Sequence, residues 1–162
     1  MSEETVIHKD VGARLSLAEW EGADTHLGIK FIRKAADETV NNSDVLQDDD
    51  ELKWDVAANE VWAFTGYFRK LSTIATVKYQ WSIPVNATLF SKRTNTAPGA
   101  EIAHNVSDTV SADAVLQVSH YFGIYIGGDT GGTVNLRWAQ NVASVSDTTV
   151  KANSWIVAVR LA

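Results

Sequence analysis

Four consecutive carboxylates, Asp48, Asp49, Asp50 and Glu51, form the densest group of chemically capable side chains in the sequence. Carboxylate oxygens are the preferred ligands of hard cations such as Ca²⁺. Neighbours along a turn point in different directions, however, whereas an EF-hand loop places its ligands at alternate positions and ends on a distant Glu. We therefore interpret "LQDDDEL" as a solvated turn whose charges discourage edge-to-edge strand pairing, and we predict no metal site there.

Histidine and cysteine chemistry finds little support in the sequence. The four histidines, His8, His26, His104 and His120, are far apart, so no pair has the short spacing of a zinc site. The absence of cysteine excludes a thiolate nucleophile, a disulfide scaffold and a cysteine zinc site. His120 lies in an apolar stretch, and we expect it to be a hydrogen-bonded core or interface residue.

The glycine-rich stretch "GGDTGGT", residues 127–133, does not have the sequence of a phosphate-binding loop. It lacks the Lys-Ser/Thr ending and lies between expected strands rather than before a helix. Gly and Asp supply the positive φ angles of tight turns, so we predict a hairpin turn. No serine lies in a nucleophile elbow, and no pair of acids suggests glycoside hydrolysis. We predict a protein that is not an enzyme and needs no cofactor, with a glycan-degrading enzyme as the least favoured alternative.

Size and charge set further bounds. The chain has 162 residues, 20 Asp and Glu against 14 Lys and Arg, and no apolar run near the roughly 20 residues of a membrane span. An acidic balance argues against nucleic acid as a partner. The first ten residues lack the apolar segment of a signal peptide. We expect one soluble domain, made in a cytoplasm and without a membrane or nucleic-acid partner.

The elements that would position any site are strands. From Ile29 onward apolar residues recur with period two, most clearly in "TVKYQWSIP" and "TVNLRWAQ". About eight such stretches are separated by turn signals, with no helical segment between them. We predict an all-β, antiparallel jelly-roll β-sandwich over residues 29–162, preceded by an extended N-terminal arm over residues 1–28.

The six tryptophans admit two interpretations. Exposed rings would stack on sugars and make a carbohydrate-binding surface, whereas buried rings would be core. Trp62, Trp81 and Trp138 alternate with polar neighbours, which favours the core. Trp20 lies in the arm, where we expect it to anchor the chain to a partner.

The stretch "AVLQVSHYFGIYIGG" is apolar on both faces over much of its length. Without helices to form a third layer, a subunit interface is the simpler explanation. We place Leu116, Val118, His120, Phe122, Ile124 and Ile126 on the inner face. We expect Val115, Tyr121 and Tyr125 to face the partner subunit.

Two stretches resemble a known family: "NNSDVLQDDDELKWDVAANEVWAFTGYF" (residues 41–68) and "GGTVNLRWAQNVASVSDTTVKANSWIVAVRL" (residues 131–161). They are similar to a β-sandwich module of tailed-bacteriophage structural proteins, with the pattern "LQ-D-D-L", "V-AN--W-F-G" and "G---L-WAQN". The resemblance implies a jelly roll like that of tumour necrosis factor. The family's proteins are commonly trimeric and occur in head decoration proteins, head fibres and tail fibres.

The arm sequence "GARLSLAEWEGADTH" also resembles an attachment segment of phage proteins. The resemblance implies a homotrimeric capsid decoration protein on the virion surface, assembled in the host cytoplasm. Its partners would be the major capsid protein or another virion protein. We expect Arg14, Leu15, Trp20 and His26 to make the arm's contacts with the capsid or a neighbouring subunit. The alternative is a receptor- or glycan-binding domain of a tail fibre or spike.

Overall fold

The computed structural model describes residues 28–73, 75–94 and 101–162, and all of its regular elements are strands. The predicted arm, with Arg14, Leu15, Trp20 and His26, lies outside the described residues apart from Gly28. The strands are β1 (Ile29–Arg33), β2 (Glu38–Val40), β3 (Gln47–Val56), β4 (Val61–Ser72), β5 (Val77–Ser82), β6 (Thr88–Arg93), β7 (Ile102–Ala103), β8 (Asp108–Val110), β9 (Asp113–Ile126), β10 (Gly132–Gln140), β11 (Thr148–Val150) and β12 (Trp155–Arg160).

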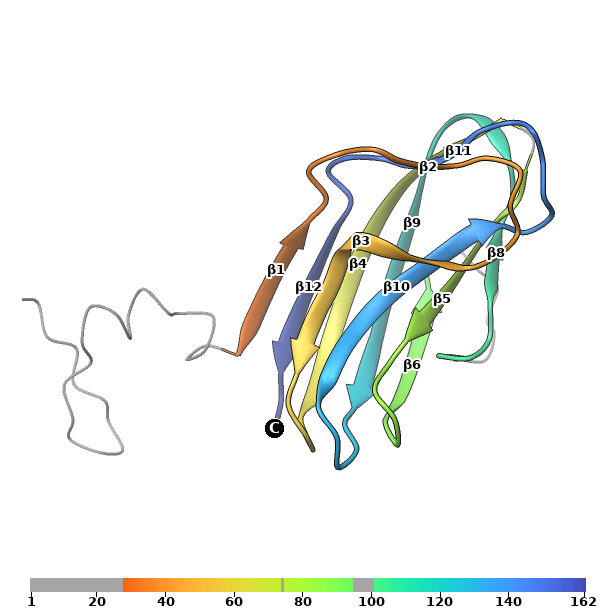
Figure 1. The fold of residues 1–162 in the computed structure, drawn as a ribbon. Helices are drawn as coiled ribbons and strands as arrows, with labels where there is room; N and C mark the ends of the chain where they lie inside the picture. Colours follow the sequence, from red (N-terminus) through yellow and green to blue (C-terminus); the bar gives the residue numbers. More distant parts are fainter. Residues whose placement is uncertain (1–27, 74, 95–100) are drawn as a thin grey trace, which may run out of the picture.

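The strands form two antiparallel sheets packed as a sandwich, which confirms the predicted fold class (Figure 1). The eight-stranded sheet contains the path β1-β12-β4-β9-β6-β7, with β11 and β2 beside it, and the four-stranded sheet has the order β3-β10-β5-β8. From β3 to β6, and again from β8 to β10, each successive strand lies in the opposite sheet. The first and last strands, β1 and β12, are paired, and this arrangement is a jelly roll.

The core forms because inward positions of both sheets are apolar at every second residue. In β4 the even-numbered residues are buried and the odd-numbered ones half-buried. Trp62, Trp81 and Trp138 are all buried, which confirms their predicted place in the core. Aromatic rings dominate the centre: the Phe68 ring centroid lies 5.5 Å from that of Tyr121 and 5.8 Å from that of Tyr79.

Two local predictions are wrong. The run "LQDDDEL" is not a turn, because Gln47–Val56 is one strand in which Asp49 is fully buried. The stretch "GGDTGGT" is not a hairpin turn, because the strands it joins, β9 and β10, lie in different sheets. Gly66 pairs regularly with Ile156 and Tyr121. A Cβ atom at Gly66 would lie 2.6 Å from the Phe68 ring, so this glycine makes room for a core side chain.

Gly123 gives a testable steric constraint on the pairing of β9 with β6. A Cβ atom there would lie 2.3 Å from the Phe90 carbonyl oxygen and 2.6 Å from the Phe64 ring. We expect Gly123→Ala to lower the free energy of unfolding by about 1–3 kcal/mol, as overpacking does. Gly132→Ala is the matched control, since its Cβ would first meet Pro84 at 3.1 Å. Equal denaturation midpoints for the two variants would contradict this explanation.

Candidate functional site

The two outer faces of the sandwich differ in chemistry. The outward positions of the four-stranded sheet are polar, and they include Lys53, Asp55, Lys78, Gln80, Thr133, Asn135 and Arg137. The outward positions of the eight-stranded sheet are mostly apolar. This contrast identifies the outer side of the eight-stranded sheet as the candidate functional site, because large exposed apolar patches on folded proteins mark interaction surfaces.

The apolar face is a lattice of outward side chains across five neighbouring strands. Cα pairing aligns Phe31 of β1 with Val157 of β12, Val157 with Thr65 of β4, and Thr65 with Phe122 of β9. Phe31 is 74% exposed and Phe122 is 48% exposed. The apolar face is defined here as Ile29, Phe31, Ala63, Thr65, Tyr67, Phe90, Leu116, Val118, His120, Phe122, Ile124, Ile126, Trp155, Val157 and Val159.

Two contacts hold side chains of the apolar face in fixed positions. The rings of Tyr67 and Trp155 stack with centroids 5.7 Å apart and planes 8° from parallel. The Thr65 hydroxyl lies 2.8 Å from His120 Nε2, which confirms the prediction that His120 is hydrogen-bonded. Side chains held by such contacts lose less conformational freedom when a partner covers them.

The charged residues at outward positions of the strands that carry the apolar face are all basic. Among the described outward positions of β1, β12, β4, β9 and β6 there is no Asp or Glu, whereas Arg33, Arg69 and Lys92 occupy such positions. Arg33 donates to the Asn153 side chain over 2.7 Å, and Arg69 donates to the Ala152 carbonyl over 2.7 Å. The surface therefore suits an apolar partner that also brings carboxylates.

The assignment of Tyr121 and Tyr125 to a subunit interface is wrong. Both side chains point into the core and are 2% and 0% exposed, respectively. The Tyr121 hydroxyl donates to the Asp108 carboxylate, which Arg93 also contacts over 2.8 Å. Burial raises the pKa of the Tyr121 phenol, and the charge of Asp108 raises it further. Val115, by contrast, is 60% exposed, so this residue is accessible to a partner.

The strand β9 is apolar on both sides as predicted, but its inner and outer sides are exchanged. Leu116, Val118, Phe122 and Ile126, expected to face inward, are 39–48% exposed on the apolar face. Strand alternation shows which residues share a side but not which side is buried. Nothing in the alternation marks the tyrosine side as the inner one, because the Tyr121 hydroxyl meets its acceptor, Asp108, only in the folded sandwich.

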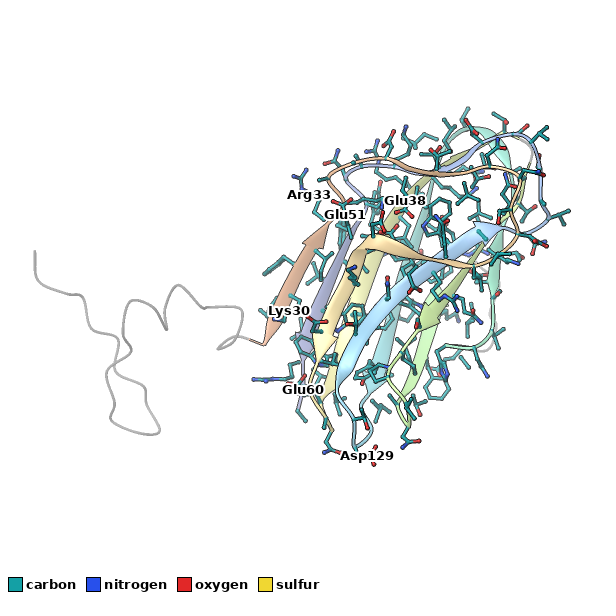
Figure 2. The ribbon with its side chains drawn as sticks, viewed as in Figure 1. Lys30, Arg33, Glu38, Glu51, Glu60 and Asp129 are labelled. Atoms are coloured by element: carbon teal, nitrogen blue, oxygen red, sulfur yellow. The ribbon has the colours of Figure 1, made fainter. Side chains whose placement is uncertain are left out.

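The acidic run has a structural role around one buried lysine. Lys34 Nζ lies 2.6 Å from Glu38 Oε2, 2.9 Å from Asp49 Oδ1 and 3.8 Å from Glu51 Oε2. Figure 2 shows Glu38 and Glu51 close together at one end of the sandwich. Burial alone would lower the pKa of Lys34, but hydrogen bonds to Glu38 and Asp49 hold that pKa above its ordinary value.

Asp49 also accepts hydrogen bonds from the core and the backbone. Its Oδ2 accepts from Trp138 Nε1 over 3.2 Å, and its Oδ1 accepts from the Leu52 amide over 2.9 Å. Both oxygens of the Asp49 carboxylate thus accept hydrogen bonds from within the fold. No group of His, Asp and Glu suited to a metal ion occurs in the described part of the chain.

A second, polar feature lies on the four-stranded sheet. A shallow hollow of about 520 Å³ is lined by residues of β3 and β10, including Asp48, Lys53, Asp55 and Asn135. Asn135 is 8% exposed, and its Oδ1 atom has no hydrogen-bond partner. The Thr133 hydroxyl donates to Asp55 over 2.7 Å and so orients that carboxylate.

Fold and site together define a class: a jelly-roll sandwich with one polar and one apolar outer face. No protein-family model matches the chain, and no curated protein matches its sequence. A structure of infectious bursal disease virus Gx strain is similar over 82% of this chain and 40% of that chain, at 10% identity and a TM-score of 0.28. A structure of the Gt strain of that virus is similar over the same shares, at 6% identity and a TM-score of 0.28.

The chain thus spans less than half the length of those viral chains. Within residues 28–73, 75–94 and 101–162, no helix has the length and apolarity needed to cross a membrane.

Proposed function

We propose that this protein is a non-enzymatic structural component of a virion that acts by assembly. In its specific form, it is a homotrimeric capsid decoration protein of a tailed bacteriophage. Residues 1–28 would attach it to the shell or to a neighbouring subunit. The observation that carries the proposal is the apolar face, which extends over five strands and exposes Phe31 and Phe122.

Three further features support an assembly role. The jelly-roll fold agrees with the resemblance of residues 41–68 and 131–161 to phage structural modules. The carboxylates in the "DDDE" run that hydrogen-bond within the fold hold strands together around Lys34. Burial of an apolar face between copies also stabilises the folded state through mass action, which suits a particle that persists outside the cell.

Phe122→Asp tests the assembly role of the apolar face. Phe122 is 48% exposed, so the fold tolerates the change, but an unpaired carboxylate would be buried if copies associate through this face. We expect light scattering after size exclusion to give a trimer for the parent chain and a monomer for Phe122→Asp. Lys53→Asp on the polar face is the matched control and should remain trimeric. A monomeric parent chain, or a trimeric Phe122→Asp variant, would contradict the proposed role of this face.

The hollow around Asn135 favours a second candidate function, binding of a neutral glycan. Asp55 and Lys53 provide an acceptor and a donor for sugar hydroxyls in the hollow, and Asn135 lines the hollow beside them. Asp55→Ala should abolish any glycan-array signal, whereas Thr109→Ala, which lies outside the hollow on the same sheet, should preserve it. Binding that survives Asp55→Ala would show that the hollow is not the site.

A further inference from the structure

We infer that the apolar face of each subunit is covered by the N-terminal segment, residues 1–27, of a neighbouring subunit. The inference rests on the proposed homotrimer and names the part of the second copy that its interface uses. It is argued from the symmetry that the proposed trimer would have and from two observations: the basic outward charges of the apolar face and the place where the described chain begins.

Symmetry requires two different contact patches. A closed trimer is built from heterologous contacts, in which one patch of a subunit meets a different patch of the next. Two copies of the apolar face packed on each other would instead give a two-fold dimer. The polar face of the four-stranded sheet carries Lys53, Asp55 and Lys78 and is a poor match for the exposed rings of Phe31 and Phe122. The second patch is therefore sought outside the sandwich.

Charge identifies residues 1–27 as the complementary patch. This segment contains six carboxylates against Lys9 and Arg14, so it carries four of the six net negative charges of the chain. The apolar face is bordered by Arg33, Arg69 and Lys92 and has no outward carboxylate on its five described strands. The opposite charges of the segment and the apolar face favour their pairing. Two apolar faces carry like charges, which disfavours packing one on the other.

The same segment supplies apolar groups for the face. Spread among its carboxylates are the apolar residues Val6, Ile7, Val11, Leu15, Leu17, Trp20 and Leu27. A ring such as Trp20 is the residue type that most often anchors an interface. A segment of this composition can bury apolar side chains against Phe122 and its neighbours while its carboxylates reach the cationic margin.

The segment joins the sandwich beside the apolar face. The described chain starts at Gly28, whose carbonyl accepts from the Arg160 amide over 2.5 Å, and continues into the edge strand β1 (Figure 1). A chain of 27 residues can extend about 90 Å. Five strands of a sheet are only about 20 Å wide. The segment is therefore long enough to cross to the next subunit and lie along its apolar face.

Cross-linking in the full chain tests this contact, because the natural sequence contains no cysteine. Ala18→Cys is placed in the segment and Val118→Cys on the apolar face, where Val118 is 39% exposed. The double variant is treated with a short bismaleimide and resolved on a denaturing gel. The controls are the two single variants and the double variant Ala18→Cys, Lys53→Cys. Lys53 lies on the polar face, so this pair has no cysteine on the apolar face. Light scattering records the mass of each untreated protein.

Covalent dimers and trimers that form several-fold more in the Ala18→Cys, Val118→Cys pair than in every control would support the inference. Equal cross-linking by Val118→Cys alone would show face-to-face contact and overturn it. A link confined within one chain, detected by peptide mapping, would place the segment on its own subunit and also overturn it. A trimeric mass with cross-linking at the control level would overturn the inferred contact and leave the proposed trimer intact. A monomeric mass would overturn both.

Discussion

Replacement of Asp49 by alanine is expected to lower the free energy of unfolding by about 3–5 kcal/mol, the cost of breaking a buried ion pair. Asp49 is 0% exposed. Its loss would leave Trp138 Nε1 and the Leu52 amide without their acceptor and would remove one of two close carboxylates from Lys34. The measurement is guanidinium denaturation at a fixed protein concentration, because association changes apparent stability.

Asp50→Ala is the control for Asp49→Ala, since Asp50 is the neighbouring carboxylate and is exposed. A loss for Asp49→Ala no larger than that for Asp50→Ala would show that the buried network contributes little. The pKa of Lys34 is raised above its ordinary 10.5, so its contribution is complete below that pH and is lost as pH rises through the folded value. Lys34→Met should therefore show less alkaline destabilisation than the parent chain.

Phe68→Ala is expected to cost about 3–5 kcal/mol, as large-to-small changes of buried phenylalanine do. Phe68 is 0% exposed and lies between the rings of Tyr79, Trp81 and Tyr121, which come from both sheets. Its removal opens a cavity where the sheets meet, and the surrounding rings can fill that space only in part.

The same denaturation experiment measures Phe68→Ala against Val145→Ala, a truncation at a site that is 81% exposed. We expect the Val145 variant to lie within about 0.5 kcal/mol of the parent chain. Unfolding midpoints that coincide for the two variants would contradict the central position of Phe68 in the core.

The two outer faces of the sandwich would serve different purposes in an assembly. The apolar face would be turned toward other subunits, and the polar face, with its hollow near Asn135, would then remain accessible. Assembly and ligand binding would thus use opposite sides of the sandwich. Variants of Phe122 and Asp55 can therefore separate the two functions.

Much of the fold was predictable because period-two alternation directly reflects burial on one side of a strand. The strands containing Trp62, Trp81 and Trp138 were predicted with the correct inward sides, and polar residues mark the outer sides of the Trp81 and Trp138 strands. Twelve strands occur among the described residues where about eight were expected, because β2, β7, β8 and β11 are only two or three residues long. Such short pairings depend on a neighbouring strand rather than on their own sequence.

The candidate site was predictable only in part. The sequence showed that the strand around Tyr121 is apolar on both sides. It did not show which side the core takes, because both sides carry large apolar residues. The tertiary structure decides this: Tyr121 points between the sheets, where Asp108 of β8 accepts from its hydroxyl, and the next residue, Phe122, therefore lies on the outer face.

The sequence by itself therefore determined an all-β sandwich with aromatic residues at inward positions. It also determined that the strand around Tyr121 has apolar residues on both sides. Tertiary structure alone decided that the "DDDE" run is a strand, because only the fold brings Lys34 and Trp138 to Asp49 from positions 15 and 89 residues away. It also decided that five separate strands combine into one apolar face. The physical reason is common to both: contacts between distant strands depend on sheet order and register, which local alternation does not specify.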